Sequence, residues 1–357
     1  MKNIKYVFIH GLSGWGSYDE NHKWMPYWGM RNGDLMEFLA KRGYDSYAAS
    51  VSPNGSAWDR SCELYAQITG TVTDYGEVHS RENSHGRFGK DYSERALVPD
   101  WDDDSVLVLI GHSFGGTTAR LFADLMENGC EEERKATPES ELSPLFRGGM
   151  TGRIRSIVTL ASPINGTSAY DISRDPDFDP KTVKAPWWSN VLSRLTSGRL
   201  KTGRYDRERK DYADYEMHID QARRLNERIR TLPGIYYFSV PFSSTKKQKD
   251  GIYRPVRMEP FLVKSSCKLG VYKGFTREGT PVDEKWREND GLVNTFSEKA
   301  PFNAPSKPFE RENIPKGIWN VFPVKEGDHM WPQGGMLHKH DIADFYLDLL
   351  GMINALS

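Results

Sequence analysis

The sequence has few cysteines, no long apolar run and almost no net charge. Its 357 residues include three widely spaced cysteines, Cys62, Cys130 and Cys267, and no Cys-x-x-Cys motif. This usage excludes a disulfide-rich scaffold and a cysteine-based zinc motif. No stretch approaches the roughly 18 apolar residues of a membrane-spanning helix. With 48 basic and 49 acidic residues the net charge is -1, so nothing indicates nucleic acid or an anionic membrane as a partner.

The start of the sequence also lacks the features of a leader. It reads MKNIKYVFIHG, and an apolar run of about five residues is too short for the core of a signal peptide. We therefore expect a cytoplasmic protein, or a secreted one if a leader was removed ahead of this sequence.

Strand-like and helix-like patterns alternate along the chain. Apolar strand patterns lie at residues 5–10, 46–51, 105–110, 153–163 and 234–240, and helical patterns at 32–44, 56–70, 117–129 and 338–353. The alternation predicts an α/β fold with a mostly parallel sheet flanked by helices. Residues 71–104, 164–212 and 241–320 break the pattern, and long irregular segments in such a frame are typical of functional insertions.

One serine stands where the central strand pattern ends. The segment VLVLIGHSFGGTTARLF places Ser113 within Gly111-x-Ser113-x-Gly115, a spacing that turns a strand sharply into a helix and exposes the hydroxyl. Gly-Ser-Gly punctuation is also common at ordinary turns. A nucleophilic serine further needs a histidine to take its proton and a carboxylate to orient that histidine.

The partners of such a serine follow it in the order acid, then histidine. Four histidines lie far enough along the chain: His218, His329, His338 and His340. His329 lies in a loop, whereas the charged helix around His218 predicts a solvent-facing side chain and the last two open the final helix. Asp290 occurs in Asn-Asp-Gly, which is equally a common turn sequence. For the oxyanion, we expect backbone N–H donors from Phe114 and from Leu12 in the loop HGLSGWG.

Several motifs together resemble one family. In chain order the sequence carries FIHGLSGWG, SAWDRSCELYAQ, TVTDYGEVHSRENSHGRFGKDY, GHSFGG and WRENDGLVNT. These segments resemble the thermoalkalophilic bacterial lipases and the related staphylococcal lipases over nearly the whole chain. The resemblance implies one α/β-hydrolase domain, residues 1–357, with insertions at 71–104 and 164–212. It also implies ester hydrolysis with Asp290 as the acid and His329 as the base.

The resemblance further implies a structural zinc ion. In the family an Asp and two histidines, which match Asp59, His79 and His85, hold the ion together with a fourth carboxylate. The matching position here is Glu216, where the family has Asp. Two histidines and two carboxylates suit tetrahedral zinc, although the longer Glu requires the site to relax. Without the resemblance, these residues would also fit the charged surface of an insertion.

Two departures from the family predict differences. The family's calcium site uses acidic residues shortly after the catalytic histidine, where this chain has Trp331 and Met336, so we expect no calcium site of that type. The lid segment is shorter than in the family. Its apolar residues are Trp187, Trp188, Val191, Leu192 and Leu195. They fit a reduced lid, the wall of an acyl pocket, or plain packing.

The sequence therefore predicts a serine lipase or esterase that acts on acyl glycerides or similar esters through an acyl-enzyme. A phospholipase, thioesterase or acyltransferase is the alternative, because these chemistries share the same triad. An inactive metal-binding scaffold is the alternative from another class, and a serine-directed phosphonate would distinguish it. A zinc-dependent hydrolase is disfavoured, because four protein ligands leave the metal no open position.

Overall fold

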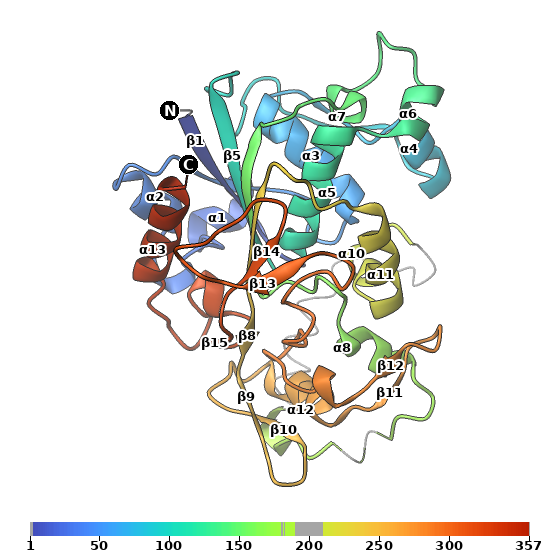
Figure 1. Cartoon of the computed structure of the whole chain (residues 1–357), viewed down its shortest axis with the longest axis vertical. Helices are drawn as coiled ribbons and strands as arrows, with labels where there is room; N and C mark the ends of the chain where they lie inside the picture. Colours follow the sequence, from blue (N-terminus) through green and yellow to red (C-terminus); the bar gives the residue numbers. More distant parts are fainter. Residues whose placement is uncertain (1–2, 180, 182, 190–209, 357) are drawn as a thin grey trace.

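The computed structural model describes residues 3–179, 181, 183–189 and 210–356. Seven strands form one central sheet in the order β13-β14-β7-β6-β5-β1-β2 (Figure 1). They are β1 (Asn3–Ile9), β2 (Ser46–Ala49), β5 (Ser105–His112), β6 (Ile154–Leu160), β7 (Tyr236–Val240), β13 (Ser306–Pro308) and β14 (Trp319–Val321). Every neighbouring pair runs parallel, which confirms the predicted parallel sheet.

The central strands are apolar because both faces of the sheet are covered. Ile9 and Leu107 belong to one buried core, and Phe8 and Val108 belong to a second core on the other face. Successive side chains of a strand point to opposite faces, so a doubly covered strand needs apolar residues at nearly every position. All residues of β5 are buried accordingly.

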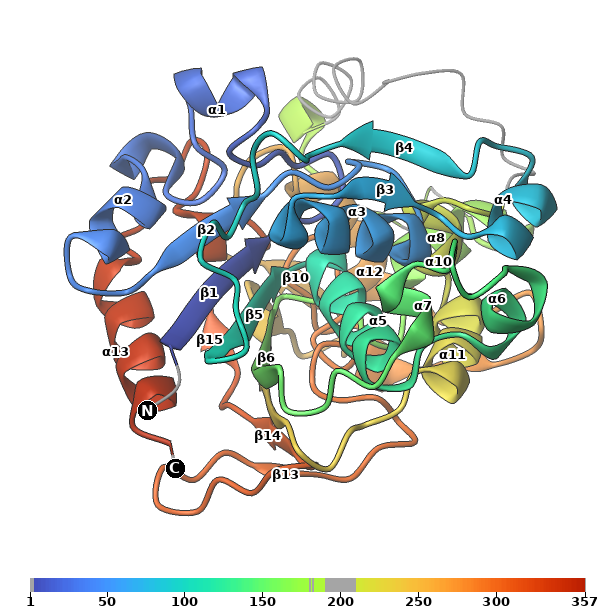
Figure 2. The same ribbon diagram turned by 90° about the horizontal axis from the view of Figure 1, so that it is seen from above.

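Two pairs of helices cover the sheet (Figure 2). Helices α3 (Ala57–Thr69) and α5 (Phe114–Asn128) lie on one face, and α2 (Leu35–Ala40) and α13 (Ala343–Asn354) lie on the other. The start of α3 agrees with its sequence signal, because the Ser56 hydroxyl caps the helix by accepting from the Asp59 N–H at 3.2 Å.

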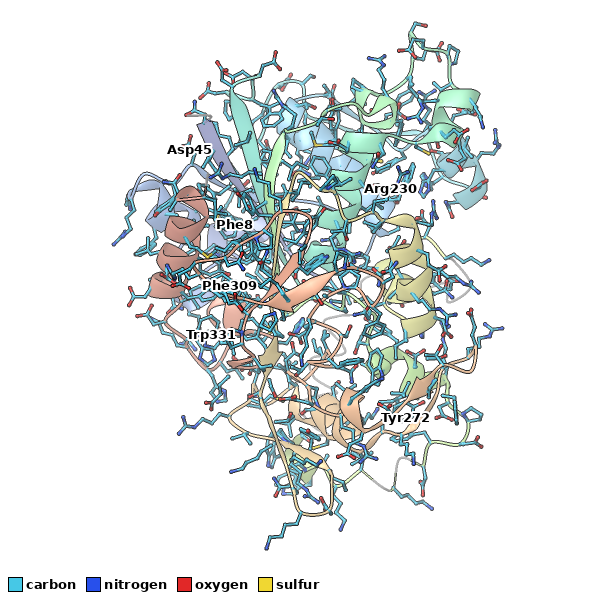
Figure 3. All side chains as sticks on the ribbon, in the orientation of Figure 1. Phe8, Asp45, Arg230, Tyr272, Phe309 and Trp331 are labelled. Carbon is cyan, nitrogen blue, oxygen red and sulfur yellow. The ribbon has the colours of Figure 1, made fainter. Side chains whose placement is uncertain are left out.

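Shorter elements fill the irregular segments. Residues 71–104 hold β3 (Val72–Asp74), α4 (Glu77–Asn83) and β4 (Phe88–Asp91). The lower part of Figure 1 holds α8 (Ser168–Asp171), β9 (Thr245–Lys247), β10 (Tyr253–Pro255), α12 (Val263–Val271), β11 (Gly274–Phe275) and β12 (Pro281–Val282). A small core that includes Ile172, Leu269 and Tyr272 packs there; Tyr272 and the sheet residue Phe8 are labelled in Figure 3.

The remaining helices and strands connect these parts. They are α1 (Glu20–Trp24), α6 (Glu131–Ala136), α7 (Pro144–Arg147), α10 (Ala213–Glu216), α11 (Ile219–Arg228), β8 (Phe242–Ser243) and β15 (Lys325–Glu326). Within the described ranges, no helix combines the length and the apolar character needed to cross a membrane. Cys62, Cys130 and Cys267 are all unpaired.

Candidate active site and metal centre

The turn from β5 into α5 holds Ser113 in a strained conformation. Ser113 lies between the last strand residue and the first helix residue, with φ 54° and ψ -130°. Positive φ is rare for a residue with a side chain, so surrounding contacts must enforce it. One such contact is the hydrogen bond from the Ser113 N–H to the Leu160 carbonyl, 2.9 Å long. Gly115 permits the close approach of the helix, because a Cβ there would lie 2.1 Å from the Ile9 carbonyl oxygen.

Asp290 and His329 form a buried hydrogen-bonded pair. The Nδ1 atom of His329 lies 2.5 Å from Oδ2 of Asp290, and the backbone N–H of His329 donates to the Asp290 carbonyl at 2.9 Å. The other carboxylate oxygen of Asp290 accepts from the N–H groups of Leu292 and Val293 at 2.9 and 2.7 Å. With Nδ1–H of His329 donating to this carboxylate, the Nε2 atom of the neutral imidazole carries the free lone pair.

His112 ties His329 to the serine turn. The Nε2 atom of His112 donates to the His329 carbonyl at 2.8 Å, and the two rings have centroids 4.8 Å apart. The Nδ1 atom of His112 then accepts from the Tyr27 hydroxyl at 2.6 Å, and that hydroxyl accepts from the Gly11 N–H at 3.1 Å. Burial, together with the neighbouring His329, lowers the pKa of His112 well below its ordinary value. This neutral relay therefore links β5, the loop after β1 and the loop of His329.

The loop after β1 lies directly against Ser113. A Cβ added at Gly11 would lie 2.7 Å from the Cβ of Ser113. Among the described residues, no acceptor is bonded to the backbone N–H of Leu12 or of Phe114. Both predicted oxyanion donors therefore belong to backbone next to the serine and have no competing partner in the described part of the chain. Leu12 precedes the tight turn at Ser13, whose φ is 57°.

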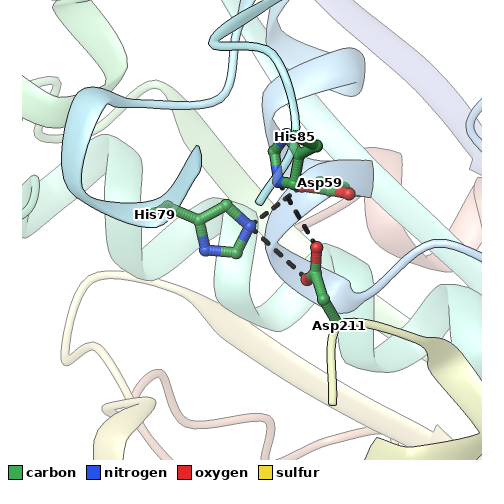
Figure 4. Close-up of side chains that lie close together, drawn as sticks. All are labelled: Asp59, His79, His85 and Asp211. Atoms are coloured by element: carbon green, nitrogen blue, oxygen red, sulfur yellow. Dashed lines mark hydrogen bonds and ion pairs between the residues drawn. The ribbon is translucent and has the colours of Figure 1, made fainter. Parts of the chain in front are cut away.

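A second cluster brings together Asp59, His79, His85 and Asp211 (Figure 4), whose ligand atoms all lie within 4.8 Å of one another. The Nε2 atom of His79 is 3.1 Å from Asp59 and 3.4 Å from Asp211, and that of His85 is 3.4 Å from Asp211. His85 Nδ1 donates to the Gly86 carbonyl at 2.9 Å, while its buried Nε2 has no hydrogen-bond partner. An unpaired lone pair aimed at two carboxylates fits a bound cation.

The fourth carboxylate is Asp211 and not Glu216, so this expectation is corrected. Tyr212 forms a β-bridge with Gly55, and the Ala213 N–H donates to the Asn54 carbonyl at 3.0 Å. This contact sets Asp211 next to the start of α3, before α10 begins. Glu216 lies at the end of α10 instead, where its Oε2 accepts from the Ala57 N–H at 2.7 Å. Burial raises the pKa of Glu216 to about 7.

The expectation that His218 faces solvent is wrong. Its side chain is buried, and its Nδ1 lies 3.0 Å from Asp171 Oδ1. The second oxygen of Asp171 accepts from the Ile219 N–H at 3.2 Å, at the start of α11. The charged sequence of the helix gave no sign of this partner, because Asp171 lies on α8, far away along the chain.

The lid segment is described only in part. Trp187 is 78% exposed and Trp188 is 38% exposed. Val191, Leu192 and Leu195 lie outside the described residues. Trp331 and Met336 follow His329 without contributing a carboxylate, and the absence of a calcium site stays a prediction.

The parallel sheet, its two helical layers and the serine turn after β5 define an α/β-hydrolase fold. The family model described as "Lipase-like, C-terminal domain" matches residues 2–183 and 198–348. The chain belongs to this lipase-like family.

Named relatives agree with this assignment. Lipase 1 of Staphylococcus aureus (strain MRSA252) is 31% identical over 350 residues, which cover 91% of this chain and 50% of that protein. The chain thus spans about half the length of this relative. Among solved structures, EstA of Clostridium botulinum has a TM-score of 0.84 at 30% identity, covering 99% of this chain and 88% of EstA. Staphylococcus hyicus lipase has a TM-score of 0.80 at 26% identity, with 99% and 96% covered.

Proposed function

We propose that the protein hydrolyses carboxylic esters through an acyl-enzyme formed on Ser113. The observation that carries this proposal is the hydrogen bond between His329 Nδ1 and the buried Asp290 carboxylate, next to the strained serine turn. With Nδ1 engaged in that bond, Nε2 of His329 is available to take the proton of the serine hydroxyl.

In the proposed mechanism the Ser113 hydroxyl oxygen attacks the ester carbonyl. His329 accepts the hydroxyl proton and returns it to the leaving alcohol, while Asp290 fixes the imidazole tautomer and stabilises its cation. The N–H groups of Leu12 and Phe114 donate to the negatively charged oxygen of the tetrahedral intermediate. Water then attacks the acyl–serine ester with His329 as the base, and the carboxylic acid leaves.

The substrate class follows from the relatives and from the family. Relatives named lipase support this class, and we propose acyl glycerides or similar esters as substrates. The exposed indole rings of Trp187 and Trp188 support an apolar surface on the segment expected to cover the site.

We also propose that Asp59, His79, His85 and Asp211 hold a structural zinc ion. Two imidazoles and two carboxylates form a complete tetrahedral set, which leaves no position for a substrate. The ion would cross-link α3, the segment that contains α4 and the chain before α10. The unpaired Nε2 of His85 and the stacking of Trp58 on the His79 ring support a preformed site.

The test is hydrolysis of p-nitrophenyl esters from acetate to palmitate, comparing wild type with Ser113→Ala. The control is Ser306→Ala, an exposed serine on β13 of the same sheet. We expect activity in wild type and in the control, and loss by about 10⁶-fold in Ser113→Ala. Unchanged activity in Ser113→Ala would contradict the proposal. Parallel assays on phospholipid and thioester substrates decide between an esterase and the alternative acyl-transfer activities.

A further inference from the structure

A buried carboxylate outside the proposed triad binds the loop that follows His329. Glu259 is fully buried. Its Oε1 atom accepts from three consecutive backbone N–H groups: Met336 at 2.7 Å, Leu337 at 2.6 Å and His338 at 2.9 Å. Successive backbone N–H groups that converge on one oxygen form a concavity suited to an anion. The loop 336–338 is therefore shaped around this carboxylate.

Glu259 also holds the residue that precedes His329. Its backbone N–H donates to Oδ2 of Asp328 at 2.6 Å, and Oδ1 of Asp328 accepts from the Met330 N–H at 3.0 Å. One residue thus bonds the His329 loop on both sides, at Asp328 through its N–H and at 336–338 through its side chain. Glu259, Asp328 and Met330 are buried and Met336 is half-buried, whereas the side chains of Leu337 and His338 are exposed, so Glu259 ties a surface loop to the interior.

The negative charge matters to this arrangement. Hydrogen bonds to an ionised acceptor are about twice as strong as those between neutral groups. The side chain of Glu259 therefore serves as the anion that the N–H groups of the loop bind. The side chains of Trp331 and Met336 on this loop pack against the apolar core and offer no charged acceptor.

We propose that Glu259 is a positioning residue that sets His329 for proton transfer. The inference rests on the proposed role of His329. Loss of the carboxylate frees the loop between Asp328 and His338, and the imidazole of His329 is then held less firmly against Asp290 and His112. The expected consequence is slower chemistry with little change in substrate binding, because Glu259 is buried beneath the loop and does not touch the ester.

The test compares Glu259→Ala and Glu259→Gln with wild type on the preferred p-nitrophenyl ester. Since a misplacement of about 1 Å can lower a rate by about 100-fold, we expect Glu259→Ala to lower kcat by about that factor with KM nearly unchanged. The amide oxygen of Glu259→Gln still accepts the three N–H groups without the charge, so we expect partial rescue, to within about tenfold of wild type. The matched control is Glu326→Ala, an exposed acid on β15.

Two further measurements do not need activity. We expect amide hydrogen exchange at residues 336–338 to be slow in wild type and fast in Glu259→Ala. We also expect the low-field NMR signal of the proton between His329 and Asp290 to weaken or shift in Glu259→Ala. A folded Glu259→Ala with wild-type kcat, or with an unchanged low-field proton, would overturn the proposal. If Glu259→Ala does not fold, a Glu259→Gln variant with wild-type exchange rates and wild-type kcat overturns the role of the charge.

The two proposals fail in different ways. If wild type hydrolyses no ester, the proposed function fails, whereas the exchange and NMR measurements still report whether Glu259 positions the loop. If wild type is active and Ser113→Ala is not, unchanged kcat in Glu259→Ala removes only the positioning role.

Discussion

The carboxyl group of Glu298 is buried beside that of Asp290. Burial, with the adjacent negative charge of Asp290, raises the pKa of Glu298 well above its ordinary value. The raised pKa favours the neutral carboxyl group, and its Oε2 accepts from the Phe242 N–H at 2.6 Å. A neutral Glu298 adds no negative charge beside the carboxyl group that holds His329.

Glu298→Gln is expected to preserve both stability and kcat, because an amide, like the neutral acid, can donate from one terminal atom while the other accepts. Glu298→Ala leaves a cavity and an unbonded Phe242 N–H, and we expect it to lower the free energy of unfolding by about 3 kcal/mol. Urea denaturation measures both variants. Equal destabilisation by the two changes would mean that Glu298 is ionised in the folded protein.

Asp290→Asn tests the acid of the proposed triad. An amide at this position no longer enforces the Nδ1–H tautomer of His329, and we expect kcat to fall by about 10⁴-fold with the fold intact. Residues that act as one unit are not additive. The double variant with Ser113→Ala should therefore be no slower than Ser113→Ala alone, and a further large loss in the double variant would argue against a shared step.

Asp211 lies in the metal cluster and Glu216 lies outside it, so variants of the two residues give a paired test of the metal site. We expect wild type to contain one zinc ion per chain, Asp211→Ala to lose it with a fall in Tm, and Glu216→Gln to retain it. Elemental analysis of purified protein with thermal unfolding gives both readouts. Loss of zinc from Glu216→Gln alone would restore Glu216 as the ligand, and a metal-free wild type whose Tm is unaffected by a chelator would remove the site.

The stability of the His329 loop should depend on pH through Asp328. Burial, aided by the charges of Glu259 and Asp290, raises the pKa of Asp328 from 3.8 to about 6. The folded protein then binds this proton more tightly than the unfolded chain does. The contribution of Asp328 to stability is largest below about pH 4 and is lost as the pH rises to about 6, by about 3 kcal/mol in total.

Asp328→Asn should remove this part of the pH dependence. The measurement is the free energy of unfolding across that pH range, with the exposed acid variant Glu312→Gln as the control. Parallel profiles for wild type and Asp328→Asn would show that Asp328 titrates normally in the folded protein.

The sheet was predictable from the sequence, whereas its last two strands were not. Strands β1, β5, β6 and β7 are rich in apolar residues because both of their faces are almost entirely buried. Strands β13 and β14 have only three residues each and lie at one edge. No periodicity can be read from so short a segment, so the region 241–320 looked irregular.

In the candidate site, too, some residues could be predicted from the sequence and others could not. Ser113 was found from local glycine spacing, because the turn itself requires those glycines. His329 is predicted from its order and loop position together with the family motifs, and Asp290 mainly from those motifs, since their contact joins two separate loops. Asp211 and Glu216 are five positions apart, and only the bridge between Gly55 and Tyr212 decides which carboxylate faces His79. Glu259 had no sequence signal, because its ligands are backbone N–H groups, which every residue carries.

The backbone conformation of Ser113 lowers the stability of the fold at the residue proposed as the nucleophile. A non-glycine residue with φ near 54° costs on the order of 1–3 kcal/mol, and the fold bears that energy whether or not an ester is ever bound. Glycine enters this region freely, so Ser113→Gly would relax the turn and at the same time abolish the nucleophile. On stability alone, glycine would be favoured over serine at this position. The strain at Ser113 is the structural cost of the nucleophilic role proposed for its hydroxyl.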